Sequence, residues 1–258
     1  MTLNQGVTEV ALALRLADQM ASTAYLDDEV AERFAEDYAR VPVLSTEYPT
    51  VEQLLAAEPD LAIASYPSAF GDTGVGTREE LVGRGTATYV SPLTCPDESG
   101  LGPAFESVWT ELREVGLLTG AADTAEEEVQ AQRTALEEIE ATAAGEGLSI
   151  VWYDSGDDTP LVGAGDGGPQ LLMDAVGATN VFADLDGGWA DGSWETVLAA
   201  DPDVIVLADA AWSTAEDKRA YLESDPVLGQ LSAVQDERYV VVPFSESTPG
   251  VRMVDGAR

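Results

Sequence analysis

The sequence predicts an α/β protein of two lobes, each with a central parallel-type sheet flanked by helices, joined by one long backbone helix. Three observations support this prediction. Short apolar runs alternate with helical stretches in both halves of the chain, a helical pattern free of Gly and Pro fills the middle, and a 13-residue pattern recurs once. A length of 258 residues suits two modest lobes.

The predicted elements of the first lobe alternate between strand and helix. Residues 1–3 have the pattern of a strand end, and residues 7–16 that of the following helix. Further β-like runs at residues 42–44, 61–65 and 88–90 are separated by helical stretches. Because this alternation is typical of a parallel sheet, residues 1–120 are assigned to an N-terminal α/β lobe.

The middle of the chain predicts the long helix. Thr124 and Glu127 have the spacing of a capping box, in which each side chain bonds the other's backbone amide. Apolar residues then recur at helical spacing until Gly145 and Gly147 end the run. About 20 residues of helix span roughly 30 Å. Residues 121–147 are therefore assigned to the interlobe helix.

The second half of the chain repeats the pattern of the first. β-like runs at residues 148–153, 204–208 and 239–244 alternate with helical stretches, so residues 148–258 are assigned to a C-terminal α/β lobe. The halves also share a motif, because residues 51–63 match residues 194–206 at an offset of 143. Each copy predicts a short helix, an acid-Pro-Asp turn and a buried strand, which favours duplication of a lobe.

Composition excludes many functions. With 12 Lys and Arg against 48 Asp and Glu, the net charge is −36, which disfavours nucleic acid and anionic membrane surfaces. The absence of His removes Ser/His and Cys/His catalysis and His metal ligands, and Cys95 alone forms no internal disulfide. These absences exclude most classes of enzyme but leave carboxylate chemistry open. Our expectation is a non-enzymatic monomer without a resident cofactor or metal.

No run approaches the roughly 18 apolar residues of a membrane span, and no signal peptide opens the chain. Both ends have the appearance of cut elements, from which we expect that a targeting segment has been trimmed.

A glycine motif offers a hypothesis from another class. Residues 163–168 satisfy G-x-G-x-x-G between an apolar run and a helix, and Asp184 follows about twenty residues later. This spacing is typical of a dinucleotide-dependent α/β oxidoreductase. The competing interpretation is a glycine turn that places the N-terminus of a helix at a binding cleft.

Aromatic and arginine side chains follow the predicted strands, where the ligand crevice of such folds lies. Candidate ligand-binding aromatics are Tyr25, Tyr48, Tyr66, Tyr153, Trp189, Trp212 and Phe244. Arginines are scarce, so Arg78 and Arg252, both in Gly-containing segments, are candidates for pairing with a ligand carboxylate or phosphate. The alternative for both arginines is a surface ion pair.

Residues 8–18 and 49–63 resemble the N-lobe signature of the helical-backbone (class III) substrate-binding proteins of ABC importers for ferric siderophores and cobalamin. Residues 177–181, 193–205 and 225–243 are similar to the C-lobe pattern, so the resemblance covers nearly the whole chain. Arg15 stands where the family has the glycine that ends a helix, and we expect this cap to be strained.

The resemblance implies capture of a bulky ligand in the cleft between the lobes and its delivery to an ABC permease dimer, outside the cytoplasm, either in the periplasm or lipid-anchored at the cell surface. A ferric siderophore or similar metal chelate is the leading ligand, and cobalamin, haem or an anionic deazaflavin-type precursor the alternative. In this family one Glu of each lobe docks onto permease arginines. The matching residues are Glu52 and Glu195, which the repeat places at equivalent positions.

Overall fold

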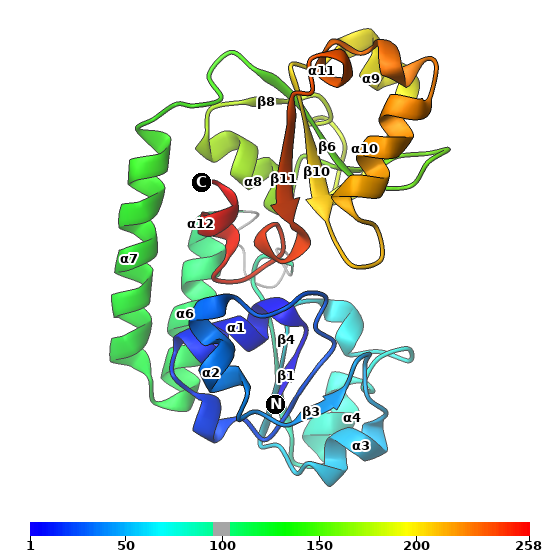
Figure 1. Cartoon of the computed structure of the whole chain (residues 1–258). Coiled ribbons are helices and arrows are strands. Elements are labelled where there is room, and N and C mark those ends of the chain that lie inside the picture. Colours follow the sequence, from blue (N-terminus) through cyan, green and yellow to red (C-terminus); the bar gives the residue numbers. More distant parts are fainter. Residues whose placement is uncertain (95–103) are drawn as a thin grey trace. The chain divides into compact units, whose positions relative to one another are not determined.

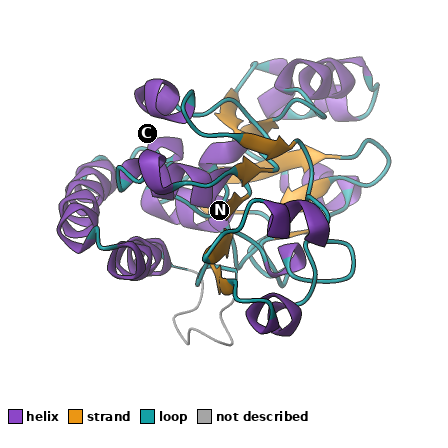
Figure 2. Ribbon diagram, turned by 90° about the horizontal axis from the view of Figure 1, so that it is seen from below, coloured by secondary structure: helices purple, strands orange, loops and turns teal. Residues whose placement is uncertain are grey.

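The computed structural model describes residues 1–94 and 104–258, so Cys95 lies outside the described residues. The chain divides into two compact units, which are described separately. Unit 1 comprises Met1–Gln132 and Pro249–Arg252, and unit 2 comprises Arg133–Thr248 and Met253–Arg258. In each unit helices flank a central sheet, which confirms the predicted α/β fold class (Figure 1, Figure 2).

Unit 1 contains a fully parallel sheet with the strand order β3-β2-β1-β4-β5. Its strands are β1 (Thr2–Leu3), β2 (Thr23–Ala24), β3 (Val43–Ser45), β4 (Leu61–Ala64) and β5 (Ala87–Val90). Its helices are α1 (Gln5–Ala13), α2 (Ala35–Tyr38), α3 (Val51–Ala56), α4 (Arg78–Gly83) and α6 (Phe105–Thr119), with 3₁₀ turns η1 (Ala17–Gln19), η2 (Glu32–Phe34) and η3 (Pro67–Ala69).

Alternation along β4 places side chains on both faces of this sheet. Ile63 packs into a core with residues of α1 and α6, whereas Ala62 and Ala64 pack against Leu54 of α3 and Leu81 of α4. Figure 1 shows α1 and α6 on one side of β1 and β4, and α3 and α4 on the other. The strands are therefore buried on both faces, as expected of a parallel sheet.

The long helix is α7 (Ala122–Glu140), and the division between the units falls within it, after Gln132. The capping-box prediction is wrong, because α7 begins two residues before Thr124. Gly120, with φ of +79°, ends α6 in the left-handed conformation, and the amide of Ala121 donates to Gly116 O. This glycine cap ends α6 so that α7 begins at Ala122, and Thr124 therefore lies inside the first turn of α7 and not at its N-cap.

Unit 2 contains a mixed sheet with the order β11-β10-β6-β7-β9, and β8 pairs with β6. Its strands are β6 (Ser149–Ser155), β7 (Leu161–Gly163), β8 (Thr179–Asn180), β9 (Trp189–Asp191), β10 (Val204–Asp209) and β11 (Tyr239–Pro243). Its helices are α8 (Gly168–Ala175), α9 (Trp194–Ala200), α10 (Ala215–Ser224), α11 (Ser232–Gln235) and α12 (Met253–Gly256), with 3₁₀ turns η4 (Leu228–Gln230) and η5 (Phe244–Glu246).

The strands β6, β10 and β11 are parallel, whereas β7 is antiparallel to both β6 and β9. Val151 and Ile205 pack on one face of the sheet in a core that includes Leu222 of α10. Figure 1 shows α9, α10 and α11 on this side of the sheet and α8 and α12 on the other. The prediction of a parallel-type sheet is therefore confirmed, with an antiparallel extension at one edge.

The duplicated motif forms a capped short helix followed by a turn and a strand in both units. Thr50 caps α3 by accepting from the amide of Gln53, and Ser193 caps α9 by accepting from the amide of Thr196. Glu58 and Asp201, both in the acid-Pro-Asp turn, adopt φ of +47° and +42°. The repeat thus extends to the cap and to a rarely used backbone conformation, as expected for a duplicated unit.

Arg15 adopts the conformation of a helix-ending glycine, with φ of +59° after α1. We expect Arg15→Gly to raise the free energy of unfolding by about 0.5–1 kcal/mol, because Gly relieves the left-handed penalty at a smaller entropic cost. Urea unfolding measures the change. Arg15→Ala is the control, since it removes the same side chain but keeps Cβ, and an equal gain in both variants would contradict the strain.

Glu111 of α6 is fully buried, and burial raises its pKa to about 8, with Glu114 adding to the rise and the Ser91 hydroxyl opposing it. The folded state therefore holds this proton more tightly than the unfolded chain, in which Glu titrates near pH 4.5. Folding stability due to this group is complete below about pH 4.5 and falls by at most about 1.4 kcal/mol per pH unit as the pH rises to about 8.

We expect Glu111→Gln to lose less stability than the unmodified protein between pH 5 and about 8, because its amide has no proton to release. Urea unfolding at several pH values measures this difference. Glu137→Gln, at an exposed position of α7, is the matched control. Parallel stability curves for the Glu111 variant and the unmodified protein would refute the raised pKa.

Candidate functional site

The carboxyl ends of the parallel strands in unit 1 bring two predicted residues together. Tyr25 follows β2 and Tyr48 follows the neighbouring β3, and their rings stack with centroids 4.5 Å apart. Asn4, which follows β1, donates from Nδ2 to the Tyr48 hydroxyl at 2.9 Å. Asn4 and Tyr25 have φ of +93° and +58°, so this cluster also carries backbone strain, which often accompanies functional sites.

Acidic residues surround the tyrosine pair. Burial raises the pKa of Tyr25, and Asp27, Tyr48 and Glu47 add to the rise. Burial and the neighbouring Asp28 raise the pKa of Asp27 to about 6. This edge of unit 1 therefore presents stacked phenol rings in a negative field.

Two other predicted residues of unit 1 lie apart from this pair. Tyr66 follows β4 and is half-buried. Arg78 begins α4, and its Nε donates to Thr88 Oγ1 of β5 at 3.1 Å.

Arg252 is engaged within unit 1. Its guanidinium Nη1 lies 3.6 Å from Oε1 of Glu9, a residue of α1 that is 1% exposed. The same carboxylate accepts from Gln5 Nε2 and from the amide of Ala31. Burial raises the pKa of Glu9 while Arg252 and these hydrogen bonds oppose the rise, so Arg252 partly compensates a buried charge.

Three predicted aromatics of unit 2 lie together. Phe244 directly follows β11, and its ring centroid is 4.8 Å from that of Trp212 and 6.1 Å from that of Trp189. Trp212 stands in the turn after β10 and is 55% exposed. We call Trp189, Trp212 and Phe244 the aromatic trio.

Tyr153 has a different position from the other predicted aromatics. It is 1% exposed and belongs to the core beneath α9 and α10, where its ring meets Trp194 edge-on at 5.1 Å. β6 continues to Ser155, two residues beyond the predicted end, so Tyr153 lies within the strand and faces the core. A ligand contact by Tyr153 stays a prediction, and the proposals below do not use it.

A charged cluster that the sequence analysis did not select lies next to the trio. Asp154, near the end of β6, is 5% exposed, and burial raises its pKa while Ser155, Lys218 and the Trp189 indole oppose the rise. Lys218, the only lysine of the chain, is 3% exposed and donates to the backbone oxygens of Ala208 and Ser213. That Lys218 is the only lysine is the one feature of the sequence that could have drawn attention to this cluster.

Glu52 and Glu195 occupy equivalent exposed positions in the first turns of α3 and α9. The backbone amide of Glu52 and the Thr50 hydroxyl lower the pKa of the Glu52 carboxyl. The Ser193 hydroxyl, which donates to Glu195 Oε2 at 2.8 Å, lowers that of Glu195. Both side chains are thus ionised and accessible.

Two glycines of the G-x-G-x-x-G motif lie in close contact with the backbone of other segments of unit 2. An ideal Cβ on Gly165 would lie 2.2 Å from Ala183 O, and one on Gly168 would lie 1.8 Å from Ser247 O. The preceding strand β7 is antiparallel to β6, whereas a dinucleotide fold requires parallel strands. The dinucleotide prediction is therefore wrong, because close backbone contacts account for the glycines.

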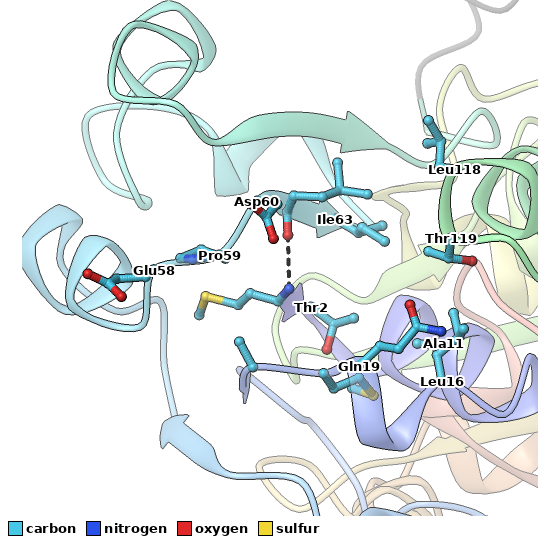
Figure 3. A pocket seen from close by; sticks show the side chains of 14 residues that line it. Thr2, Ala11, Leu16, Gln19, Glu58, Pro59, Asp60, Ile63, Leu118 and Thr119 are labelled. Atoms are coloured by element: carbon cyan, nitrogen blue, oxygen red, sulfur yellow. Dashed lines mark hydrogen bonds between the residues drawn. The ribbon is translucent and has the colours of Figure 1, made fainter.

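Two cavities lie away from the predicted ligand-binding aromatics. One of about 290 Å³ in unit 1 lies at the amino ends of β1 and β4, where Thr2, Leu16, Asp60 and Leu118 surround it (Figure 3). Another, of about 220 Å³ in unit 2, is lined by apolar side chains of β6, β10, β11 and α8. Neither is lined by a predicted ligand residue.

Within residues 1–94 and 104–258, no helix is long and apolar enough to span a membrane. No group of three or more Cys, Asp or Glu side chains in the same part of the chain is arranged to hold a metal ion.

Both units place side chains at the carboxyl ends of parallel strands, which is where open α/β sheets bind ligands. The profile of the family described as periplasmic binding protein matches residues 1–245. The chain belongs to this family, which confirms the resemblance to class III substrate-binding proteins of ABC importers. Members of this class bind a small molecule and serve a permease, and they are not enzymes.

The chain is similar to an uncharacterised ABC transporter substrate-binding lipoprotein, YvrC, of Bacillus subtilis (strain 168), at 22% identity over 96% of the chain and 74% of the relative. A periplasmic binding protein from Veillonella parvula is 28% identical, with a TM-score of 0.88 over 99% of this chain and 88% of that one. A protein described as an ABC-type Fe3+-hydroxamate transport system from Saccharomonospora viridis has 24% identity and a TM-score of 0.79, covering 99% and 89% of the two chains.

We expect Arg252→Met to lower the free energy of unfolding by about 1–3 kcal/mol, because it leaves the buried Glu9 carboxylate without its cation. Glu9→Gln in the same chain should recover most of this loss. A double-mutant cycle by urea unfolding measures the coupling. Additive effects of the two substitutions would show that the pair contributes no interaction energy.

Proposed function

We propose that the protein captures a ferric siderophore or a similar metal chelate through its strand-end aromatics and delivers it to an ABC importer. The aromatic trio is the observation that carries this proposal. Its rings combine large contact area with partial exposure, which suits a bulky ligand with planar chelating groups. The stacked Tyr25 and Tyr48 offer a similar surface in unit 1.

The transport setting supports the same proposal. A lipoprotein relative and the periplasmic family favour an extracytoplasmic protein, in the periplasm or lipid-anchored at the cell surface. The printed description of the Saccharomonospora viridis structure refers to Fe3+-hydroxamate transport, so ferric hydroxamates head the list of ligands to test.

A thermal-shift screen tests the ligand class. We expect a ferric hydroxamate or catecholate to raise the melting temperature, because a ligand that binds only the folded state stabilises it. Binding of haem, cobalamin or a deazaflavin precursor, with no response to ferric chelates, would replace the siderophore by one of those ligands.

Trp212→Ala should lower the affinity for the best-binding ferric chelate by about tenfold or more, equivalent to roughly 1.4 kcal/mol of binding free energy. The reason is that the exposed indole supplies contact area without serving the core. Tryptophan fluorescence quenching measures the affinity. Val227→Ala, another exposed apolar position of unit 2, is the control. Unchanged affinity in Trp212→Ala would show that the ligand binds to another surface.

We further propose that Glu52 and Glu195 dock onto arginines of the permease. Both carboxylates are exposed and ionised, and they stand at matching positions of a duplicated motif. A permease built from two like halves offers two like contact points to such a pair.

The Glu52→Ala/Glu195→Ala variant should bind ligand normally but support little uptake with its cognate importer, because docking charges act after ligand capture. The matched control is Glu79→Ala/Glu216→Ala, which removes exposed first-turn acids of α4 and α10. If the melting temperature changes by the same small amount in both double variants, the loss of a helix-dipole interaction explains that change. Normal uptake by the first variant would refute docking, and lost ligand affinity would reassign the pair to ligand binding.

A further inference from the structure

The carboxylate of Asp154 is a buried acceptor beside the aromatic trio. In the described part of the chain, Asp154 Oδ1 and Trp189 Nε1 are both buried without a hydrogen bond of normal geometry, although the indole is close enough to lower the pKa of the carboxyl. Oδ2 accepts from the Ser155 hydroxyl at 3.0 Å. A buried acceptor left unpaired is costly, so a group that donates to Oδ1 would be favoured here.

The neighbouring ammonium does not fill this role. Lys218 Nζ already donates to Ala208 O and Ser213 O, and it has three N–H groups in all. Burial lowers the pKa of Lys218, and the nearby Asp154, Asp209 and Asp217 oppose this shift. Three carboxylates therefore surround one cation, which leaves this edge of unit 2 negative even with Lys218 charged.

Aromatic rings and a surplus carboxylate together favour a cation. The faces of Trp and Phe rings attract ammonium groups, and Trp is the strongest of the aromatic side chains in this respect. Trp212 is 55% exposed and contacts Phe244, which contacts Trp189, so ring faces and the Asp154 carboxylate belong to one cluster. An anion would instead meet Asp154, Asp209 and Asp217 with Lys218 3% exposed.

We propose that Asp154 and the aromatic trio form a subsite for an ammonium group carried by the ligand. The inference deepens the proposed function and rests on it: the metal chelate that this protein prefers carries a positively charged amine. The ammonium donates to Asp154 Oδ1, and its remaining N–H and C–H groups lie against the rings.

Three ferric chelates with one hydroxamate core test the proposal. Ferric desferrioxamine B ends in a primary ammonium, its N-acetyl derivative is neutral, and its N-succinyl derivative ends in a carboxylate. We expect the ammonium form to bind about tenfold or more tightly than the acetyl form, with the succinyl form weakest. Fluorescence quenching at two salt concentrations measures all three. Equal affinities, or a preference for the succinyl form, would overturn the ammonium subsite.

Substitutions test whether Asp154 and Trp212 cause the preference for the ammonium form of the chelate. Asp154→Asn and Trp212→Ala should each reduce the ratio of ammonium to acetyl affinity towards unity. Trp212→Ala keeps the test decisive if Asp154→Asn fails to fold, because Trp212 is largely exposed. Glu146→Gln removes one charge from the loop that precedes the amino end of β6, and it should leave the ratio unchanged. An intact ratio in Trp212→Ala would refute the assignment.

A further experiment distinguishes the ammonium subsite from the proposed binding of a siderophore. Tetramethylammonium and n-pentylammonium are titrated in the absence of any chelate, with Trp fluorescence as the readout. Quenching by these cations that is lost in Trp212→Ala, together with no binding of any ferric chelate, would retain the subsite while refuting the siderophore. Binding of the chelates without discrimination by charge would retain the siderophore and refute the subsite.

Discussion

Parallel strand pairing is the constraint on which the candidate binding surfaces depend. In a parallel sheet every strand ends at the same edge, so residues distant in sequence meet there without any direct sequence signal. Tyr25 and Tyr48 stack because β2 and β3 are parallel neighbours. Phe244 meets Trp212 because β10 and β11 run in register from Ile205 and Tyr239 to Asp209 and Pro243. Both contacts depend on this parallel pairing, whereas Trp189 joins Phe244 from β9, which is antiparallel to β7.

The sequence predicted the elements with strong apolar periodicity and missed those formed by tertiary contacts. β4 and β10 were recognised because each is a continuous apolar run. β2, only Thr23–Ala24, has no pattern of its own and forms because β1 and β3 offer partners on both sides. β7 and β9 were likewise missed, and the glycines near β7 suggested a dinucleotide site although backbone contacts explain them.

Side-chain direction explains which candidate residues lie at the strand ends where the sequence placed them. An aromatic residue just after a strand lies at the sheet edge whatever its exact orientation, and Trp212 and Phe244 have this position, while their contact with a ligand stays a prediction. Tyr153 and Asp154 are neighbours within β6 and point to opposite faces of the sheet, so the predicted strand end, two residues too early, placed Tyr153 beyond the strand although its side chain faces the core. Asp154 was not selected because acids are abundant in this chain and a single one carries no signal.

Cations are scarce, and three of them have a defined local contact. Arg252 compensates the buried Glu9, Arg78 bonds Thr88, and Lys218 is surrounded by backbone oxygens and carboxylates. We therefore expect a ligand to be recognised largely by aromatic rings and hydrogen-bond acceptors. The net charge of −36 adds a field that repels anions at long range, but salt screens it beyond about 8–10 Å. Charge selectivity is thus expected to depend on the few groups in direct contact with the ligand, and in unit 2 the proposed groups are the Asp154 carboxylate and the faces of three aromatic rings.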